Sequence, residues 1–146
     1  MPLSGAALAR LLPQQGAMCL LDAVVHHDHC SIVCVSARHV DPSNPLTVDG
    51  RLSPLAGIEF AAQAIAAHGA LADATAGRRV RGWLARVRDC VVQCERMDDL
   101  PAPLVIEAEC IAASASALSY RFSLRAGGAM VLSGSALVAL IGDEPA

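Results

Sequence analysis

The longest apolar stretch of the chain lies near its middle. From residue 55 to residue 71, in "LAGIEFAAQAIAAHGAL", almost every position is apolar or small. Ser53 is a suitable N-cap for a helix that includes this stretch, and Pro54 suits the first helical position. Gly77 favours an end shortly afterwards. The pattern therefore predicts one long helix from Ser53 or Pro54 to about Ala74.

Regions on both sides of this helix have the pattern of strands. Residues 17–40 are rich in valine, isoleucine and leucine and are interrupted near Asp28–Cys30, which predicts two strands joined by a tight turn. The proline-rich segment 41–54 reads as an irregular connection. In four later segments polar and apolar residues alternate or apolar residues run together, which predicts strands. These segments are 81–97, 104–114, 117–126 and 129–142.

The order of these elements predicts the fold class. Two strands, one long helix and about four antiparallel strands fit an α+β protein whose curled antiparallel sheet wraps around one central helix. A helix in that position must be apolar on almost every face. The 146 residues are most simply one domain, 1–146, large enough for a substantial core.

Composition and charge narrow the class further. Hydrophobic residues make up 54% of the chain, aromatic residues 3% and charged residues 17%, so small side chains fill the core and an oligomer would hide apolar surface. The net charge of -3 does not favour a nucleic-acid partner. No secretory signal is recognised, and polar residues interrupt the long helix, so we expect a cytoplasmic protein with no membrane span.

The cysteines and histidines do not indicate a metal site. On strands, the C-x3-C spacing separates two cysteines by roughly 13 Å, which is too far for one metal ion or one disulfide. We expect most of the six cysteines to be buried and reduced. The cluster "HHDH" at 26–29 reads as a solvated turn, and His68, late in the helix, as a core or interface histidine.

Glu59 and Gln63 are the unexpected residues of the helix. They are four positions apart and therefore share a face. One interpretation is a structural pair that is hydrogen-bonded to loop backbone; the other is a general acid or base, Glu59, oriented by Gln63. Backbone N–H groups from Leu55 to Gly57 would then polarise a thioester carbonyl. Gly57 would allow a close substrate approach, or simply close helix packing.

Two segments resemble one enzyme family. "LLPQQGAMCLLDAVV" at 11–25 resembles the opening "LLPHRxPxLLxDRV" of the (3R)-hydroxyacyl-[acyl-carrier-protein] dehydratases, and "LAGIEFAAQA" at 55–64 resembles their helix motif "LxxEAMAQ". The resemblance runs from Leu11 to Ile141 and is greatest to a divergent branch associated with aryl-polyene and related polyketide pathways. It implies the hotdog fold.

The resemblance also implies an activity and its partners. Such dehydratases are homodimers that remove water from a β-hydroxyacyl thioester on an acyl carrier protein, using a histidine of one subunit and the helix carboxylate of the other. No metal or diffusible cofactor is needed. For this chain we expect catalysis by Glu59, Gln63 and His39. We expect substrate contacts from Gln14, Gly57 and Leu55. An arginine cluster just after the helix would dock the carrier protein, or would only offset the helix dipole. That cluster is Arg78, Arg79 and Arg81.

The sequence departs from the family at two histidine positions. The family's catalytic histidine lies in a "GHFPG"-type loop, where this chain has "NPLTVDGRLSP" at 44–54; Gln14 replaces the histidine after "LLP". Glu59 would then work with another group, His39 or Asp49. One alternative is a hotdog acyl thioesterase, and another is a non-catalytic subunit that binds acyl thioesters. The substrate would be a thioester of an acyl carrier protein or of CoA. The chain would form a homodimer, a higher oligomer or a hetero-oligomer with another hotdog subunit.

Overall fold

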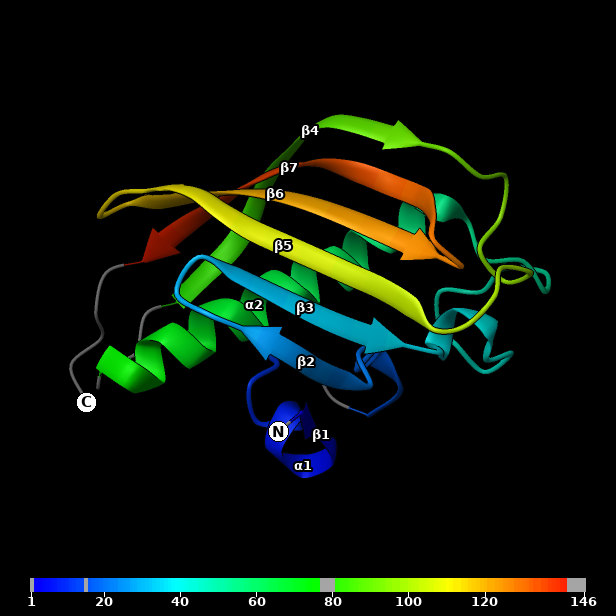
Figure 1. Ribbon diagram of the computed structural model, residues 1–146, viewed down its shortest axis with the longest axis horizontal. Coiled ribbons are helices and arrows are strands. Elements are labelled where there is room, and N and C mark those ends of the chain that lie inside the picture. The colour runs from blue at the N-terminus through cyan, green and yellow to red at the C-terminus, as the bar shows by residue number, and fades with distance from the viewer. Residues whose placement is uncertain (1, 15, 77–80, 142–146) are drawn as a thin grey trace.

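The computed structural model describes residues 2–14, 16–76 and 81–141, and they form one curled sheet around one long helix (Figure 1). All neighbouring strands are antiparallel, in the order β1-β2-β3-β5-β6-β7-β4. The strands are β1 (Leu3–Ser4), β2 (Ala23–His27), β3 (Ser31–Ser36), β4 (Arg81–Val92), β5 (Leu104–Ala113), β6 (Ala117–Ala126) and β7 (Ala129–Ile141). The helices are α1 (Gly5–Ala9) and α2 (Gly57–Ala76), with short 3-10 turns η1 (Gly16–Met18), η2 (Arg38–Val40) and η3 (Pro54–Ala56).

The predicted long helix and the strands on both sides of it are confirmed. The helix starts with the turn η3, where the Ser53 side chain accepts a hydrogen bond from the Leu55 N–H, as expected of an N-cap. The interruption near Asp28 separates β2 from β3. Short elements at the amino-terminal end, β1 and α1, were not predicted, because two to five residues carry too little periodicity to be recognised.

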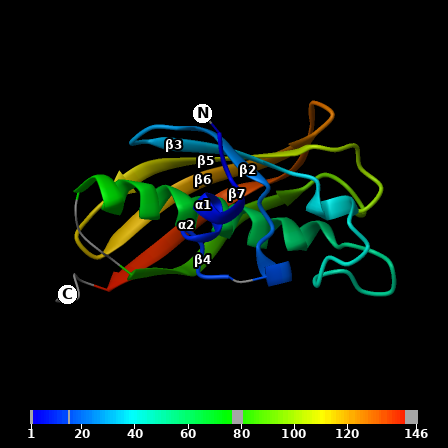
Figure 2. The same cartoon turned by 90° about the horizontal axis from the view of Figure 1, so that it is seen from below.

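The core lies between α2 and the concave face of the sheet (Figure 2). Every second residue of the central strands points toward the helix, as a strand with one covered face requires. From α2, Phe60, Ala64 and Ala67 are completely buried. Small residues allow a close approach: a Cβ added to Gly57 would lie 2.7 Å from Leu132 Cδ2. The largest fully buried side chains of the sheet are Ile32, Leu104, Ile106, Tyr120, Leu124 and Leu132.

The curled sheet covers one side of α2, and the other side of the helix is not covered by the sheet. A half-buried stripe runs along its other side. Pro54–Ala74 is long and apolar enough to cross a membrane by length and composition, with 44% of its most apolar window buried. Because the sheet buries its inner side, this is the core helix, and no membrane span is indicated among the described residues. The stripe comprises Ile58, Glu59, Ala62, Ala66, Gly69, Ala70 and Asp73.

β4 is the outermost strand beside β7, and it is irregular. Its pairing shifts between Leu84 and Arg86 and again between Arg88 and Val91. Asp89 lies in the second shift with φ 53°, in the left-handed region. The simple alternation predicted for residues 81–97 is therefore wrong after Arg88. A β-bulge places an extra residue opposite its partner strand, which the sequence pattern does not show.

All six cysteines are free, but most of them are not fully buried. Cys34 is buried, and burial raises the pKa of its thiol to about 12. Cys30 and Cys90 are exposed, so the expectation of mostly buried thiols is corrected. Those two residues lie in a turn and in the irregular strand, where neighbouring apolar residues do not imply burial. In the described part of the chain no group of three or more His, Cys, Asp or Glu residues could hold a metal ion.

His68 is confirmed as a core histidine that ties α2 to the sheet. Its Nε2 lies 2.9 Å from the Asp28 carbonyl oxygen, and its Nδ1 lies 2.5 Å from the Tyr120 hydroxyl. The carbonyl can only accept, so Nε2 carries the proton and Nδ1 accepts from Tyr120. Burial raises the pKa of Tyr120, so the hydroxyl keeps its proton.

Tyr120→Phe removes this hydroxyl and leaves the ring in place. Nδ1 of His68 then becomes a buried acceptor without a donor, and we expect the free energy of unfolding to fall by about 1–3 kcal/mol. Urea unfolding followed by circular dichroism measures the change. An unaltered midpoint would mean that the bond contributes nothing to stability.

The turn before β3 makes stability depend on pH. The Asp28 carboxylate accepts hydrogen bonds from Cys30 N at 2.9 Å and from Ser31 N at 2.7 Å, and these bonds lower its pKa from 3.8 to about 2. A lowered pKa in the folded state stabilises the fold above the ordinary pKa of the group. We therefore expect stability to fall as the pH falls from about 4 to about 2. Asp28→Asn should flatten this dependence in acid unfolding curves; identical curves for both proteins would contradict the assignment.

Candidate active site

Glu59 and Gln14 meet at the start of the long helix. Glu59 lies half-buried in the first turn of α2, and Gln14 lies in the segment between α1 and η1. Gln14 Nε2 donates a hydrogen bond to Glu59 Oε1 at 3.2 Å. Two residues that are 45 positions apart in the sequence thus form one polar pair. A carboxylate at a helix N-terminus is also stabilised by the helix dipole.

Gln63 supports this pair indirectly. It is completely buried; its Oε1 accepts from Leu20 N at 2.8 Å, and its Nε2 donates to Met18 O at 2.7 Å. These two bonds use both ends of the amide, and no described hydrogen bond joins Gln63 to Glu59. The expectation that Gln63 orients Glu59 directly is therefore corrected. Gln63 instead fixes the backbone of residues 18–20 against the helix.

The same backbone segment is held from two further sides. Cys19 Sγ donates to the Gln14 carbonyl oxygen at 2.9 Å, and Ser36 Oγ donates to the Leu20 carbonyl oxygen at 2.5 Å. Gln63 is therefore hydrogen-bonded to the backbone on both sides of Cys19, and Cys19 is hydrogen-bonded to the backbone of Gln14. This chain of contacts fixes the position from which Gln14 reaches Glu59. These contacts support the structural interpretation of Gln63, and an effect of Gln63 on Glu59 through Gln14 stays a prediction.

His39 lies elsewhere in the core. It is completely buried in η2, where Nε2 lies 3.3 Å from the Pro101 carbonyl oxygen. Its Nδ1 has no hydrogen-bond partner among the described residues. Asp49, the other proposed helper, is exposed in the tight turn between Val48 and Arg51. No described contact brings either residue to Glu59, so a catalytic role for His39 stays a prediction.

The backbone N–H groups at the start of the helix are not free, which corrects their expected role. Leu55 N donates to Ser53 Oγ at 3.2 Å, and Ala56 N donates to Ser53 O at 2.9 Å. Gly57 N donates within η3. These donors are therefore already hydrogen-bonded within the 3-10 turn before α2. Leu55 is exposed and Gly57 packs on the sheet; substrate contact by either stays a prediction.

The carrier-docking arginines are largely outside the described residues. Arg78 and Arg79 lie there, and Arg81 is described only as the first backbone position of β4. Docking through this cluster stays a prediction.

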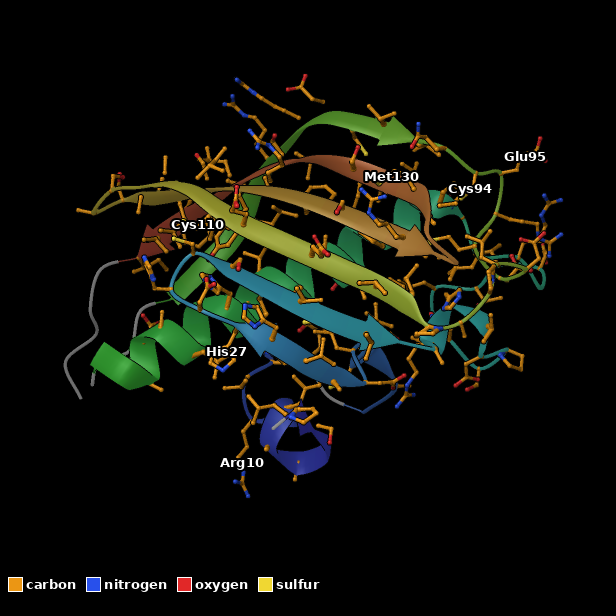
Figure 3. All side chains as sticks on the ribbon, viewed as in Figure 1. Arg10, His27, Cys94, Glu95, Cys110 and Met130 are labelled. Carbon is orange, nitrogen blue, oxygen red and sulfur yellow. The ribbon has the colours of Figure 1, made fainter. Side chains whose placement is uncertain are left out.

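Figure 3 shows Cys94 and Glu95 in the loop after β4, at the end of the molecule where α2 begins. Glu95 and Arg96 of this loop line a surface cavity of about 240 Å³ together with Leu46, Val48 and residues 51–53.

A curled antiparallel sheet packed on one long central helix defines a hotdog-fold protein, and in this chain the first turn of that helix carries a carboxylate. The chain belongs to the ApeP-like family, described as ApeP dehydratase, which matches residues 6–142. It is thus a dehydratase-like protein, as the sequence resemblance implied. No curated protein sequence matches the chain.

Solved structures confirm the fold. The dehydratase heterocomplex ApeI:P from Xenorhabdus doucetiae matches with a TM-score of 0.79 and 20% identity, covering 92% of this chain and 91% of that one. A mutant thioesterase from Pseudomonas aeruginosa matches with a TM-score of 0.62 and 14% identity, covering 81% and 79%. A hypothetical thioesterase with coenzyme A from Streptococcus pneumoniae matches with a TM-score of 0.59 and 13% identity, covering 84% and 87%.

Proposed function

We propose that this chain is the catalytic subunit of a 3-hydroxyacyl thioester dehydratase, with Glu59 as its acid and base. The observation that carries the proposal is the hydrogen bond from Gln14 Nε2 to Glu59 Oε1. An amide N–H donor fits an ionised carboxylate, which is the form that accepts a proton. The ApeP dehydratase family supplies the class of reaction.

The proposed reaction is a single elimination. Glu59 takes the proton from the α-carbon of the 3-hydroxyacyl thioester, and the electron pair of that C–H bond forms the C=C bond. The bond from the β-carbon to the hydroxyl oxygen breaks, and the hydroxyl leaves as water with the proton returned by Glu59. The products are an enoyl thioester and water, and Glu59 is ionised again. Proton transfer of this kind needs no metal or redox group.

We propose further that a second hotdog subunit pairs with β4. This strand lies at the outer side of β7, and Trp83, Val91 and Val92 are exposed along it, by 51%, 49% and 41%. Exposed apolar side chains on an edge strand, which has one side open for pairing, favour association. The half-buried stripe of α2 would be covered in the same assembly. The ApeI:P structure is a heterocomplex, which favours a different hotdog subunit over a second copy of this chain.

The carrier and the compartment are also proposed. An acyl carrier protein or CoA would present the thioester, and the arginines at 78, 79 and 81 remain the expected contact for an acidic carrier. Six free cysteines support a reducing compartment, the cytoplasm. The proposed site lies within a single hotdog domain, residues 1–146.

The test combines the chain, alone and with a hotdog subunit from the same source, with a 3-hydroxyacyl thioester on CoA or on a carrier protein. Mass spectrometry should find loss of water, faster in the mixture. Release of the free thiol would favour the thioesterase alternative. Binding without either product would favour the non-catalytic subunit and would contradict the proposal.

A further inference from the structure

Gln14 has one polar atom that the contacts described above do not use. Its Nε2 donates to Glu59, but its Oε1 is buried and has no hydrogen-bond partner among the described residues. Only one other buried side-chain atom in the described part of the chain, Nδ1 of His39, is in this state. A buried acceptor without a donor costs free energy, so its position beside Glu59 calls for a function.

The neighbouring contacts keep this oxygen in place. The amide nitrogen of Gln14 is held by Glu59, and the Gln14 backbone oxygen is held by Cys19. The amide group is planar, so fixing Nε2 on Glu59 also fixes the direction of Oε1. An ionised Glu59 cannot donate to Oε1, which excludes the flipped amide in that charge state. The oxygen can therefore only accept a hydrogen bond, and a ligand hydroxyl would supply the donor that the described residues do not.

We infer that Gln14 Oε1 accepts a hydrogen bond from the β-hydroxyl of the substrate and so selects 3-hydroxyacyl thioesters over thioesters without that hydroxyl. The inference rests on the proposed function. A hydroxyl that donates to Gln14 keeps its oxygen lone pairs free to receive the proton from Glu59. A 3-oxoacyl or an unsubstituted acyl chain has no donor and leaves Oε1 unpaired. Sites of this kind reject the analogue that lacks the hydroxyl more strongly than apolar pockets reject a change of size.

The test measures binding in the absence of turnover. In Glu59→Gln the new side chain accepts from Gln14 Nε2 as before but does not take a proton. We expect this variant to bind a 3-hydroxyacyl pantetheine thioester about tenfold more tightly than the unsubstituted acyl thioester of equal length, by calorimetry. Adding Gln14→Met should reduce the ratio to about one, because methionine has a similar length and only a weak sulfur acceptor in place of the amide oxygen.

A matched variant restores the acceptor. Glu59→Gln with Gln14→Glu exchanges the amide and the carboxylate, so an oxygen again faces the hydroxyl, and the preference should return. Thermal unfolding of each variant checks the fold, and Gln14→Ala is the second test if the methionine variant unfolds. Equal affinity for the two thioesters in Glu59→Gln, or a preference that Gln14→Met leaves unchanged, would overturn the inference.

Turnover by the unaltered chain separates this result from the proposed function. If the chain removes water but shows no preference for the hydroxyl, only the role of Gln14 fails. If it shows the preference but does not remove water, the reaction fails as proposed, and hydroxyl recognition remains as a binding property.

Discussion

Glu59→Gln is expected to lower kcat for dehydration by about 10²- to 10⁴-fold, because the amide does not accept the α-proton. The substitution keeps the size of the side chain and an oxygen that accepts from Gln14 Nε2. The KM for the thioester should therefore change little. Product formation in the presence of the second subunit, followed by mass spectrometry, gives both constants.

The control for this experiment is Glu107→Gln. Glu107 is exposed on β5, where it pairs in register with Ser123 of β6 and makes no contact with the proposed site. The Glu107→Gln substitution removes the same charge as Glu59→Gln and should leave kcat unchanged. Equal loss in both variants would indicate an effect of net charge, and full activity in Glu59→Gln would exclude Glu59 as the acid or base.

Gln63→Leu is expected to produce the largest loss of stability among single substitutions in the site. The leucine leaves the N–H of Leu20 and the carbonyl of Met18 without their partners. Each such group costs about 1–3 kcal/mol when it stays buried, so the free energy of unfolding should fall by about 2–5 kcal/mol. Chemical unfolding measures the change, and activity should fall with it because the segment that positions Gln14 is released.

Gln93→Leu is the matched control. Gln93 follows β4 and is exposed, so the same exchange of side chains should change stability by no more than about 0.5 kcal/mol. If Gln63→Leu is as stable as this control, the bonds to Met18 and Leu20 do not fix the segment.

The sequence predicts the helix and strands well because burial imposes a pattern on neighbouring residues. The run from residue 55 to residue 71 had to be a covered helix, and the alternating segments after it had to be strands. Within the site, the spacing of Glu59 and Gln63 indicated one polar face. It did not indicate which atoms would bind, because the partners of both residues lie 43 to 45 positions away.

Other features depend on geometry that no pattern contains. The shift between Arg88 and Val91 arises from one extra residue in β4, and it interrupts the alternation predicted for residues 81–97. The N–H groups of Leu55 and Ala56 were expected to be free because helix starts leave donors unpaired. The actual start is a 3-10 turn capped by Ser53, which uses them.

The reverse reaction in heavy water tests directly whether Glu59 is the acid and base. An enoyl thioester is incubated in D2O with the unaltered chain and its partner subunit, and in parallel with Glu59→Gln. We predict a 3-hydroxyacyl thioester with one deuterium on the α-carbon, delivered by Glu59, and no such product with the variant. Equal deuteration by both proteins, or free thiol in place of the hydroxyacyl thioester, would contradict it.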